Sequence, residues 1–198
     1  MHGAGNDFIV IDARSTLRLW TRLAVEMCDR HFGVGGDGIL LVEASQRANI
    51  RMRMFNPDGS ESNMCGNGLR CVAKYVIDEG LVPAGDELTI ESGAGVHLVT
   101  ARIEDGEVVS ARVGMGNPHF APAEIPVARN GVDRVVDYPI DVDGESFAVT
   151  CVSMGNPHAV TFIDRAIGDV PLEVLGPKVE HHPFFPQRVN FEIVNIRD

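Results

Sequence analysis

The sequence lacks both the long apolar runs and the positive charge that would indicate a membrane or a nucleic acid as its partner. Its densest apolar run, residues 39–42, has the length of a strand, whereas a membrane-spanning helix needs roughly 20 apolar residues. The formal net charge is −11 at pH 7, so the surface repels polyanions. Residues 1–7 contain neither the basic region nor the apolar stretch of a signal peptide. We therefore predict a cytoplasmic protein with no nucleic-acid or membrane partner.

The sequence also lacks the residue spacings of a metal, redox or dinucleotide site. Its four cysteines are Cys28, Cys65, Cys71 and Cys151. None of them forms a Cys-x-x-Cys pair, and Cys28 and Cys71 fall within helical patterns as expected core residues. His181 and His182 have no second ligand cluster nearby, and residues 33–38 are too irregular for a dinucleotide fingerprint. These spacings indicate neither a zinc site, a redox motif nor a dinucleotide site, so any special cysteine acts as a thiol or thiolate.

The spacing of apolar residues predicts an α+β protein. Helices are expected at residues 19–27, with Ser15 as N-cap, at residues 65–76, ended by Gly80, and at residues 172–180. Asp105 and Gly106 predict a hairpin turn. Strands are expected at residues 7–12, 39–43, 50–54, 87–103, 108–113, 145–153, 159–164 and 189–196.

A short repeat hints at two lobes that share an architecture. Residues 113–119 resemble residues 152–158, since both segments contain Met-Gly-Asn-Pro-His. Residues 118–137 lack clear periodicity and contain three prolines, which is typical of a crossover between such lobes.

The segment around Cys65 is the strongest candidate for chemistry. Cys65 stands where a turn-rich loop becomes a helix, so its sulfur is expected to face the unpaired backbone N–H groups of the first turn. The positive end of the helix dipole favours a thiolate, which predicts a lowered pKa. Gly66 and Gly68 allow a ligand to approach the backbone, and Asn67 adds an amide at a helix start that suits a carboxylate.

Asparagines in turn-rich segments form a second candidate set. An amide donates to a carboxylate and accepts from an ammonium without adding charge, so several together suit a zwitterionic ligand. Each asparagine alone is more often a turn former. His158 is a third candidate. A lone histidine is more often a packing or turn residue, and for His158 we give the two interpretations equal weight. The asparagines are Asn6, Asn56, Asn67, Asn156 and Asn190.

Six motifs, in this order along the chain, resemble those of the diaminopimelate epimerase family. The match runs over essentially the whole chain, and the block around Cys65 is highly specific in combination with the Gly-Asn-Pro-His block that ends at His158. The motifs lie at residues 1–8, 30–38, 55–61, 64–71, 154–158 and 185–190.

The resemblance implies a two-lobed fold of pseudo-symmetric mixed-sheet lobes around central helices, with residues 1–115 as the first lobe and residues 116–198 as a partial second lobe. It implies cofactor-free interconversion of LL- and meso-diaminopimelate, on the route to lysine and peptidoglycan, without pyridoxal phosphate or metal. Cys65 would be one acid/base, His158 would support catalysis, and a homodimer is possible. The implied substrate contacts are Asn6, Asn56, Gly66, Asn67, Asn156 and Asn190.

The chain departs from the family pattern in its second half. The family's second cysteine follows a Glu-Arg-Gly-Ala-Gly-Glu-Thr-like stretch that this sequence does not contain. Cys151 sits inside a strand pattern, with no helix start after it. We therefore expect an incomplete second lobe and little or no epimerase activity of this chain alone, because one face of the substrate lacks its acid/base.

Three alternative functions share part of this pattern. A proline racemase-like epimerase also uses two cysteines, but its motif typically reads Cys-Gly-His where this chain has Cys65, Gly66 and Asn67. A cysteine hydrolase would use Cys65 and His158 through an acyl-enzyme, although no hydrolase signature surrounds Cys65. A non-catalytic amino-acid-binding module would bind the ligand without turnover.

Overall fold

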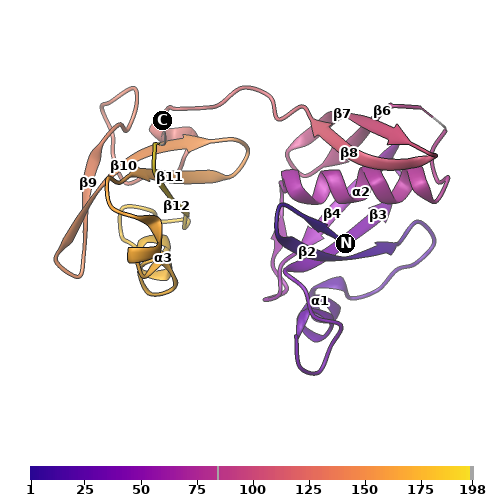
Figure 1. Cartoon of the computed structure of the whole chain (residues 1–198), viewed down its shortest axis with the longest axis horizontal. Helices are drawn as coiled ribbons and strands as arrows, with labels where there is room; N and C mark the ends of the chain where they lie inside the picture. The colour runs from indigo at the N-terminus through magenta and orange to yellow at the C-terminus, as the bar shows by residue number, and fades with distance from the viewer. Residues whose placement is uncertain (84, 197–198) are drawn as a thin grey trace. The chain divides into compact units, whose positions relative to one another are not determined.

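The computed structural model describes residues 1–83 and 85–196, and the chain divides into two compact units (Figure 1). The first unit is Met1–Met115 and the second is Gly116–Asp198. Separate clusters of buried apolar side chains form the cores of the two units. Each unit combines a mixed β-sheet with α-helix, so the predicted α+β class is confirmed.

A mixed sheet is the framework of the first unit. Among its described residues, eight strands form this sheet in the order β1-β2-β3-β4-β6-β7-β8, with β5 paired to β4 off this path. The pairs β2–β3 and β4–β6 are parallel and the others are antiparallel. The strands are β1 (His2–Gly3), β2 (Asn6–Asp12), β3 (Gly38–Glu43), β4 (Ile50–Phe55), β5 (Glu61–Ser62), β6 (Glu87–Ser92), β7 (Gly95–Glu104) and β8 (Glu107–Val113).

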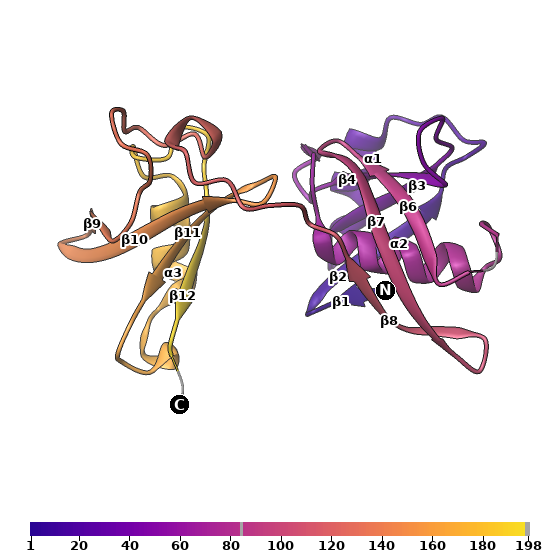
Figure 2. The same ribbon diagram turned by 90° about the horizontal axis from the view of Figure 1, so that it is seen from above.

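Two helices cover opposite faces of this sheet. Helix α2 (Gly66–Asp78) lies between the β2–β3–β4 part and the β6–β7–β8 part of the sheet, which curls around it (Figures 1 and 2). Helix α1 (Trp20–Cys28) packs on the other face of β3. Leu40 belongs to the cluster around α2 and Leu41 to the cluster around α1, because successive side chains of a strand point to opposite faces. Strand β3 is therefore buried on both sides.

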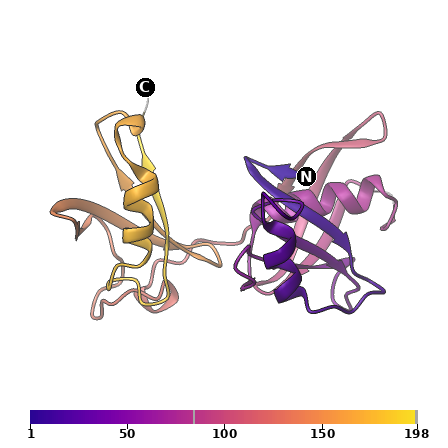
Figure 3. The ribbon, with the colours of Figure 1, turned by 90° about the horizontal axis from the view of Figure 1, so that it is seen from below.

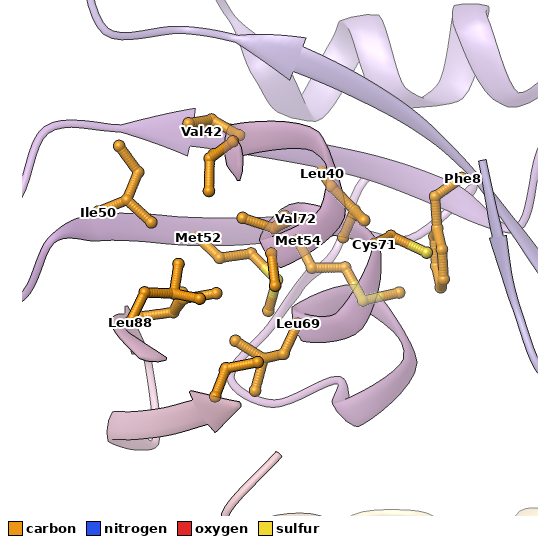
Figure 4. Close-up of a cluster of buried hydrophobic side chains, with 14 of the residues drawn as sticks. Phe8, Leu40, Val42, Ile50, Met52, Met54, Leu69, Cys71, Val72 and Leu88 are labelled. Atoms are coloured by element: carbon orange, nitrogen blue, oxygen red, sulfur yellow. The ribbon is translucent and has the colours of Figure 1, made fainter. Parts of the chain in front are cut away.

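The core between α2 and the sheet holds the start of this helix in place. Leu69 and Val72 of α2 lie among Leu40, Met52 and Leu88, which come from three strands (Figure 4). All five side chains are at most 4% exposed. The helix is thus anchored within one turn of its first residue.

The second unit is a smaller sheet with one helix on one face (Figure 3). Among its described residues, four strands run in the order β12-β11-β10-β9, with β11–β12 parallel and the other pairs antiparallel. Helix α3 (Leu172–Glu180) connects β11 to β12, and its Leu175 and Val179 join Cys151 and Ala159 in the core. The strands are β9 (Tyr138–Val142), β10 (Glu145–Ser153), β11 (Pro157–Phe162) and β12 (Asn190–Val194). The 3-10 turns are η1 (Pro122–Glu124) and η2 (Ile167–Asp169).

The two units repeat one arrangement of strands and helix. In the first unit an antiparallel pair, β1–β2, is followed by α1 and by β3, which is parallel to β2. In the second unit the antiparallel pair β10–β11 is followed by α3 and by β12, which is parallel to β11. Gly5 and Gly155 occupy the same place in the two hairpins, each with φ of 98°, directly before Asn6 and Asn156. The two asparagines are therefore related by this repeat.

Most predicted elements are confirmed, and the differences have local causes. Helix α3 has the predicted bounds, but α1 has Leu19 at its N-cap with no side-chain cap bond, so the prediction of Ser15 as N-cap is wrong. Strands β1 and β5 are two residues long, too short for a periodic pattern, and β9 is an edge strand that contains Pro139. Within residues 1–83 and 85–196, no helix is long and apolar enough to cross a membrane.

Candidate active site

Cys65 is the N-cap of α2 and has extended backbone angles (φ −151°, ψ 101°). Its sulfur accepts a hydrogen bond from the backbone N–H of Gly68 at 3.2 Å, which confirms the predicted orientation toward the helix start. A Cβ atom on residue 68 would lie 2.9 Å from Leu40 Cδ2 and 3.4 Å from the Cys65 sulfur. The glycine therefore allows the sulfur, the first turn and the core to approach one another closely.

Burial opposes the effect of the helix start on the pKa of Cys65. The side chain is half-buried and packs against the apolar cluster around α2. Burial raises the pKa of the thiol above its ordinary value, and the backbone N–H groups of Gly68 and Asn67 offset only part of that rise. The prediction of a lowered pKa is therefore wrong, because burial has the larger effect. At neutral pH the group is a thiol.

Two predicted asparagines meet directly beside this helix start. Asn67 Nδ2 donates to Asn6 Oδ1 at 2.6 Å, and Asn67 Oδ1 accepts from Arg70. Asn6 Nδ2 donates to Asp37 Oδ2 at 3.2 Å. Strand β2 and helix α2, distant in the sequence, thus bring two amides together at the first turn of α2.

Asn56 occupies a separate turn at the end of β4. Its backbone N–H donates to the carbonyl of Ser60 at 2.8 Å, and its side-chain Nδ2 donates to Ser60 Oγ at 3.0 Å. These bonds fit a turn former, and they do not join Asn56 to the chain of bonds between Asn6, Asn67 and Arg70.

A cavity of about 410 Å³ opens beside the first turn of α2. Two of its lining residues, Arg70 and Arg112, carry positive charge. A Cβ atom on residue 66 would lie 3.2 Å from the Met115 sulfur, so the glycine allows this side chain to approach the backbone closely. The lining residues are Gly66, Asn67, Arg70, Ala111, Arg112, Val113 and Met115. A cavity with this charge at a helix start suits a carboxylate.

The second unit gathers its own polar cluster on the sheet face opposite α3. His158 Nδ1 lies 2.6 Å from Glu192 Oε1, and His158 Nε2 lies 3.0 Å from Asn156 Oδ1. Asn190 stands opposite His158 in the parallel pair β11–β12, and its Nδ2 donates to the carbonyl of Pro157 at 2.9 Å. Three predicted residues, Asn156, His158 and Asn190, are thus neighbours within one unit.

Glu192 is a residue of this cluster that the sequence reasoning missed. Its Oε2 atom is buried and, within the described residues, has no hydrogen-bond partner. The only available signal was the spacing of Asn190 and Glu192, two residues apart and hence on one face of a strand. The sequence reasoning also did not identify Arg70 and Asp37 as candidate site residues.

The other cysteines are structural. Cys28, Cys71 and Cys151 are all buried, which confirms the interpretation of Cys28 and Cys71 as core residues. Burial raises the pKa of Cys151 to about 12, so this thiol is inert at neutral pH. Within residues 1–83 and 85–196, no group of three or more potential metal ligands surrounds a common point.

The chain is similar in sequence and in structure to known proteins. The model of the family "Diaminopimelate epimerase" matches residues 1–121. The chain is 48% identical over 198 residues to the diaminopimelate epimerase of Moorella thermoacetica and 44% identical over 199 residues to that of Acetivibrio thermocellus, and it spans 70% of the length of each. Among solved structures, a hydroxyproline epimerase from Agrobacterium vitis matches with a TM-score of 0.67 at 15% identity, over 96% of this chain and 62% of that one.

The fold defines the class of α+β proteins that includes this hydroxyproline epimerase structure. Within that class, the family model and the sequence relatives are decisive. The chain belongs to the diaminopimelate epimerase family.

Proposed function

We propose that this protein takes part in the epimerisation of diaminopimelate, interconverting the LL and meso forms without a cofactor. The observation that carries the proposal is the Cys65 sulfur, which accepts from the Gly68 N–H in the first turn of α2, the same turn in which Asn67 donates to Asn6. The names of the relatives supply the substrate, and the site supplies the chemistry.

Cys65 would act as the acid/base on one face of the substrate α-carbon. As an acid, its S–H bond breaks and the proton forms a C–H bond with the carbanion, leaving a thiolate. In the reverse direction the thiolate takes the α-proton, and the electron pair of the C–H bond passes to the carboxylate-stabilised carbanion. The N–H groups of Asn67 and Gly68 stabilise the thiolate, and the raised pKa keeps the resting group protonated.

The cluster of the second unit would bind the polar groups of the substrate. The unpartnered Oε2 of Glu192 is an acceptor that an ammonium group would satisfy. The amides of Asn156 and Asn190 can donate or accept, which suits a zwitterion. Glu192 holds the His158 ring by its Nδ1, so His158 would support catalysis from a fixed orientation.

The repeat suggests where a second acid/base would stand. In β2, Phe8 and Val10 face α2, whereas the corresponding residues of β11, His158 and Val160, lie on the sheet face opposite α3. Phe162, on that same face, is 55% exposed. A helix related to α2 by the repeat would cover this face and bring a second thiol to it.

Deuterium exchange tests the proposal. Cys65 is the only cysteine among the described residues that is not buried, so one face of the α-carbon has no thiol partner. We expect the 198-residue chain, incubated with LL-diaminopimelate in deuterated water, to exchange the α-hydrogen slowly with retained configuration. The measurement is mass spectrometry combined with chiral chromatography.

The Cys65→Ser variant is the control and is expected to lose the exchange. Proline, offered in place of diaminopimelate, should not exchange. Inverted product formed at the rate of an intact two-base enzyme would contradict the assignment of a single acid/base, and exchange that survives in Cys65→Ser would contradict the role of Cys65. The expected homodimer stays a prediction, which light scattering would test.

A further inference from the structure

We propose that Asp37 is a positioning residue that, together with Arg30, fixes the direction of the hydrogen bonds holding the Asn6 and Asn67 amides at the start of α2. The inference deepens the proposed function and rests on it, because these amides are two of the expected substrate contacts. Asp37 belongs to the glycine-rich turn between α1 and β3, whose residues 33–38 are too irregular for a dinucleotide fingerprint.

Arg30 clamps two carboxylates at this turn. It donates through Nη1 and Nη2 to the two oxygens of Asp7, at 2.9 and 2.7 Å, and through Nη2 to Asp37 Oδ1 at 2.8 Å. The guanidinium holds the pKa of the Asp7 carboxyl at about 2, so this carboxylate stays ionised at neutral pH. Arg30 therefore leaves the second oxygen of Asp37 facing β2.

That second oxygen receives two donors from β2. Asp37 Oδ2 accepts from the backbone N–H of Asp7 at 3.1 Å and from Asn6 Nδ2 at 3.2 Å. The backbone N–H of Asp37 in turn donates to the carbonyl of Asp7 at 2.7 Å. The carboxylate is thus fixed by its own backbone as well as by Arg30.

Hydrogen bonds link Asn6 through Asn67 to Arg70, and each of them has only one possible donor and acceptor. An ionised carboxylate can only accept, so Asn6 must turn Nδ2 toward Asp37 and Oδ1 toward Asn67. A guanidinium can only donate, so Asn67 must turn Oδ1 toward Arg70 and Nδ2 toward Asn6. An acceptor-only group at one end and a donor-only group at the other therefore determine both amide orientations.

The fixed orientations of these two side-chain amides preorganise them for ligand binding. Each Nδ2 retains one N–H, and each Oδ1 one lone pair, that this chain of bonds does not use. A substrate carboxylate or ammonium then meets donors and acceptors that need not reorient, which lowers the cost of binding. Replacing the acceptor-only group by an amide removes this constraint, because an amide can face Asn6 with either atom.

The test compares Asp37→Asn with a matched control, Asp12→Asn, in the 198-residue chain. Asp12 is the last residue of β2 and, like Asp37, pairs with an arginine, Arg14 (2.7 Å), but it makes no bond to Asn6. In ¹⁵N-labelled protein, we expect the side-chain amide signals of Asn6 and Asn67 to broaden or double in Asp37→Asn and to remain single in Asp12→Asn. Arg70→Gln, which removes the donor-only end, should broaden them as well.

Binding and thiol reactivity separate positioning from structural damage. Calorimetry with LL-diaminopimelate should give a Kd about tenfold weaker in Asp37→Asn than in the parent chain, while the rate of Cys65 alkylation stays the same. Unchanged amide signals in Asp37→Asn, or undiminished binding by it, would overturn the inference. If Asp37→Asn is unfolded, the amide signals of Arg30→Gln decide the same point, because this variant removes the guanidinium that holds Asp37 Oδ1. Failure of the parent chain to bind would contradict the proposed function, while the amide signals would still decide the positioning role.

Discussion

The thiol of Cys65 is subject to two opposing effects. Backbone N–H groups at the start of α2 favour the anion, whereas the apolar cluster around Leu69 and Val72 removes water that would solvate it. Burial is the larger effect, and the pKa rises. A raised pKa means that the thiol is the stable form in the site and that its reactivity grows only at alkaline pH.

Alkylation of the native chain tests this balance. We expect iodoacetamide to modify one of the four thiols, Cys65, because Cys28, Cys71 and Cys151 are buried. The rate should increase with pH and should still be rising beyond about pH 9, since only the thiolate reacts and an unperturbed thiol has a pKa near 8.5. Mass spectrometry of timed samples measures it.

Cys65→Ser should abolish the modification of the native chain, and unfolding in urea should expose all the thiols. A rate that levels off below pH 8 would contradict the dominance of burial over the helix start. Rapid modification of Cys151 would contradict its buried position.

At the scale of elements, α2 is stabilised by packing and not by helix propensity. Gly66 and Gly68 in its first turn each cost about 1 kcal/mol relative to alanine in a helix interior. Leu69, Val72 and Val76 are completely buried, and each burial contributes about 1.5–3 kcal/mol. The sum favours the helix, so the sequence can keep two glycines where a ligand approaches the backbone.

Gly68→Ala tests the close packing at this helix start. The added methyl would lie 2.9 Å from Leu40 Cδ2, and Leu40 is completely buried, so the core must shift. We expect the free energy of unfolding to fall by about 1–2 kcal/mol, since overpacking outweighs the gain in helix propensity. Urea denaturation measures this change.

The matched control is Gly85→Ala, where the nearest atom to an added Cβ is 3.9 Å away. This variant should change the free energy of unfolding by less than about 0.5 kcal/mol. Gly68→Ala should also alter the alkylation rate of Cys65, because the new methyl lies 3.4 Å from its sulfur. Equal stability of the two variants would contradict the proposed role of Gly68.

At the scale of the whole molecule, the two units have separate cores. The clusters around α1 and α2 draw only on residues of the first unit, and the cluster around α3 only on residues of the second. A unit of about 100 residues with its own core is large enough to fold independently.

We therefore expect the fragment Met1–Met115 to fold by itself. It should unfold cooperatively in urea, and its Cys65 should be alkylated at the rate found in the whole chain, because every contact described for this thiol lies within the first unit. Circular dichroism and mass spectrometry measure the two properties. A fragment without a cooperative transition, or with all its thiols reactive, would contradict the independence of the first unit.

The elements and the chemical candidates could be predicted from the amino-acid sequence, because both depend on local patterns. The apolar spacing of residues 172–180 defines α3, and the change from a turn-rich loop to a helical pattern locates the start of α2 at Cys65. The same local information identified Asn67 and His158 as polar groups in turn-rich segments.

Which of these groups meet, and how far each is exposed to water, depends on the folded chain. Asp37 reaches Asn6 across 31 positions, and Glu192 reaches His158 across 34, distances at which no local pattern carries a signal. The sign of the pKa shift at Cys65 was decided in the same way, because the depth of burial is a property of the assembled core and not of the segment that carries the thiol.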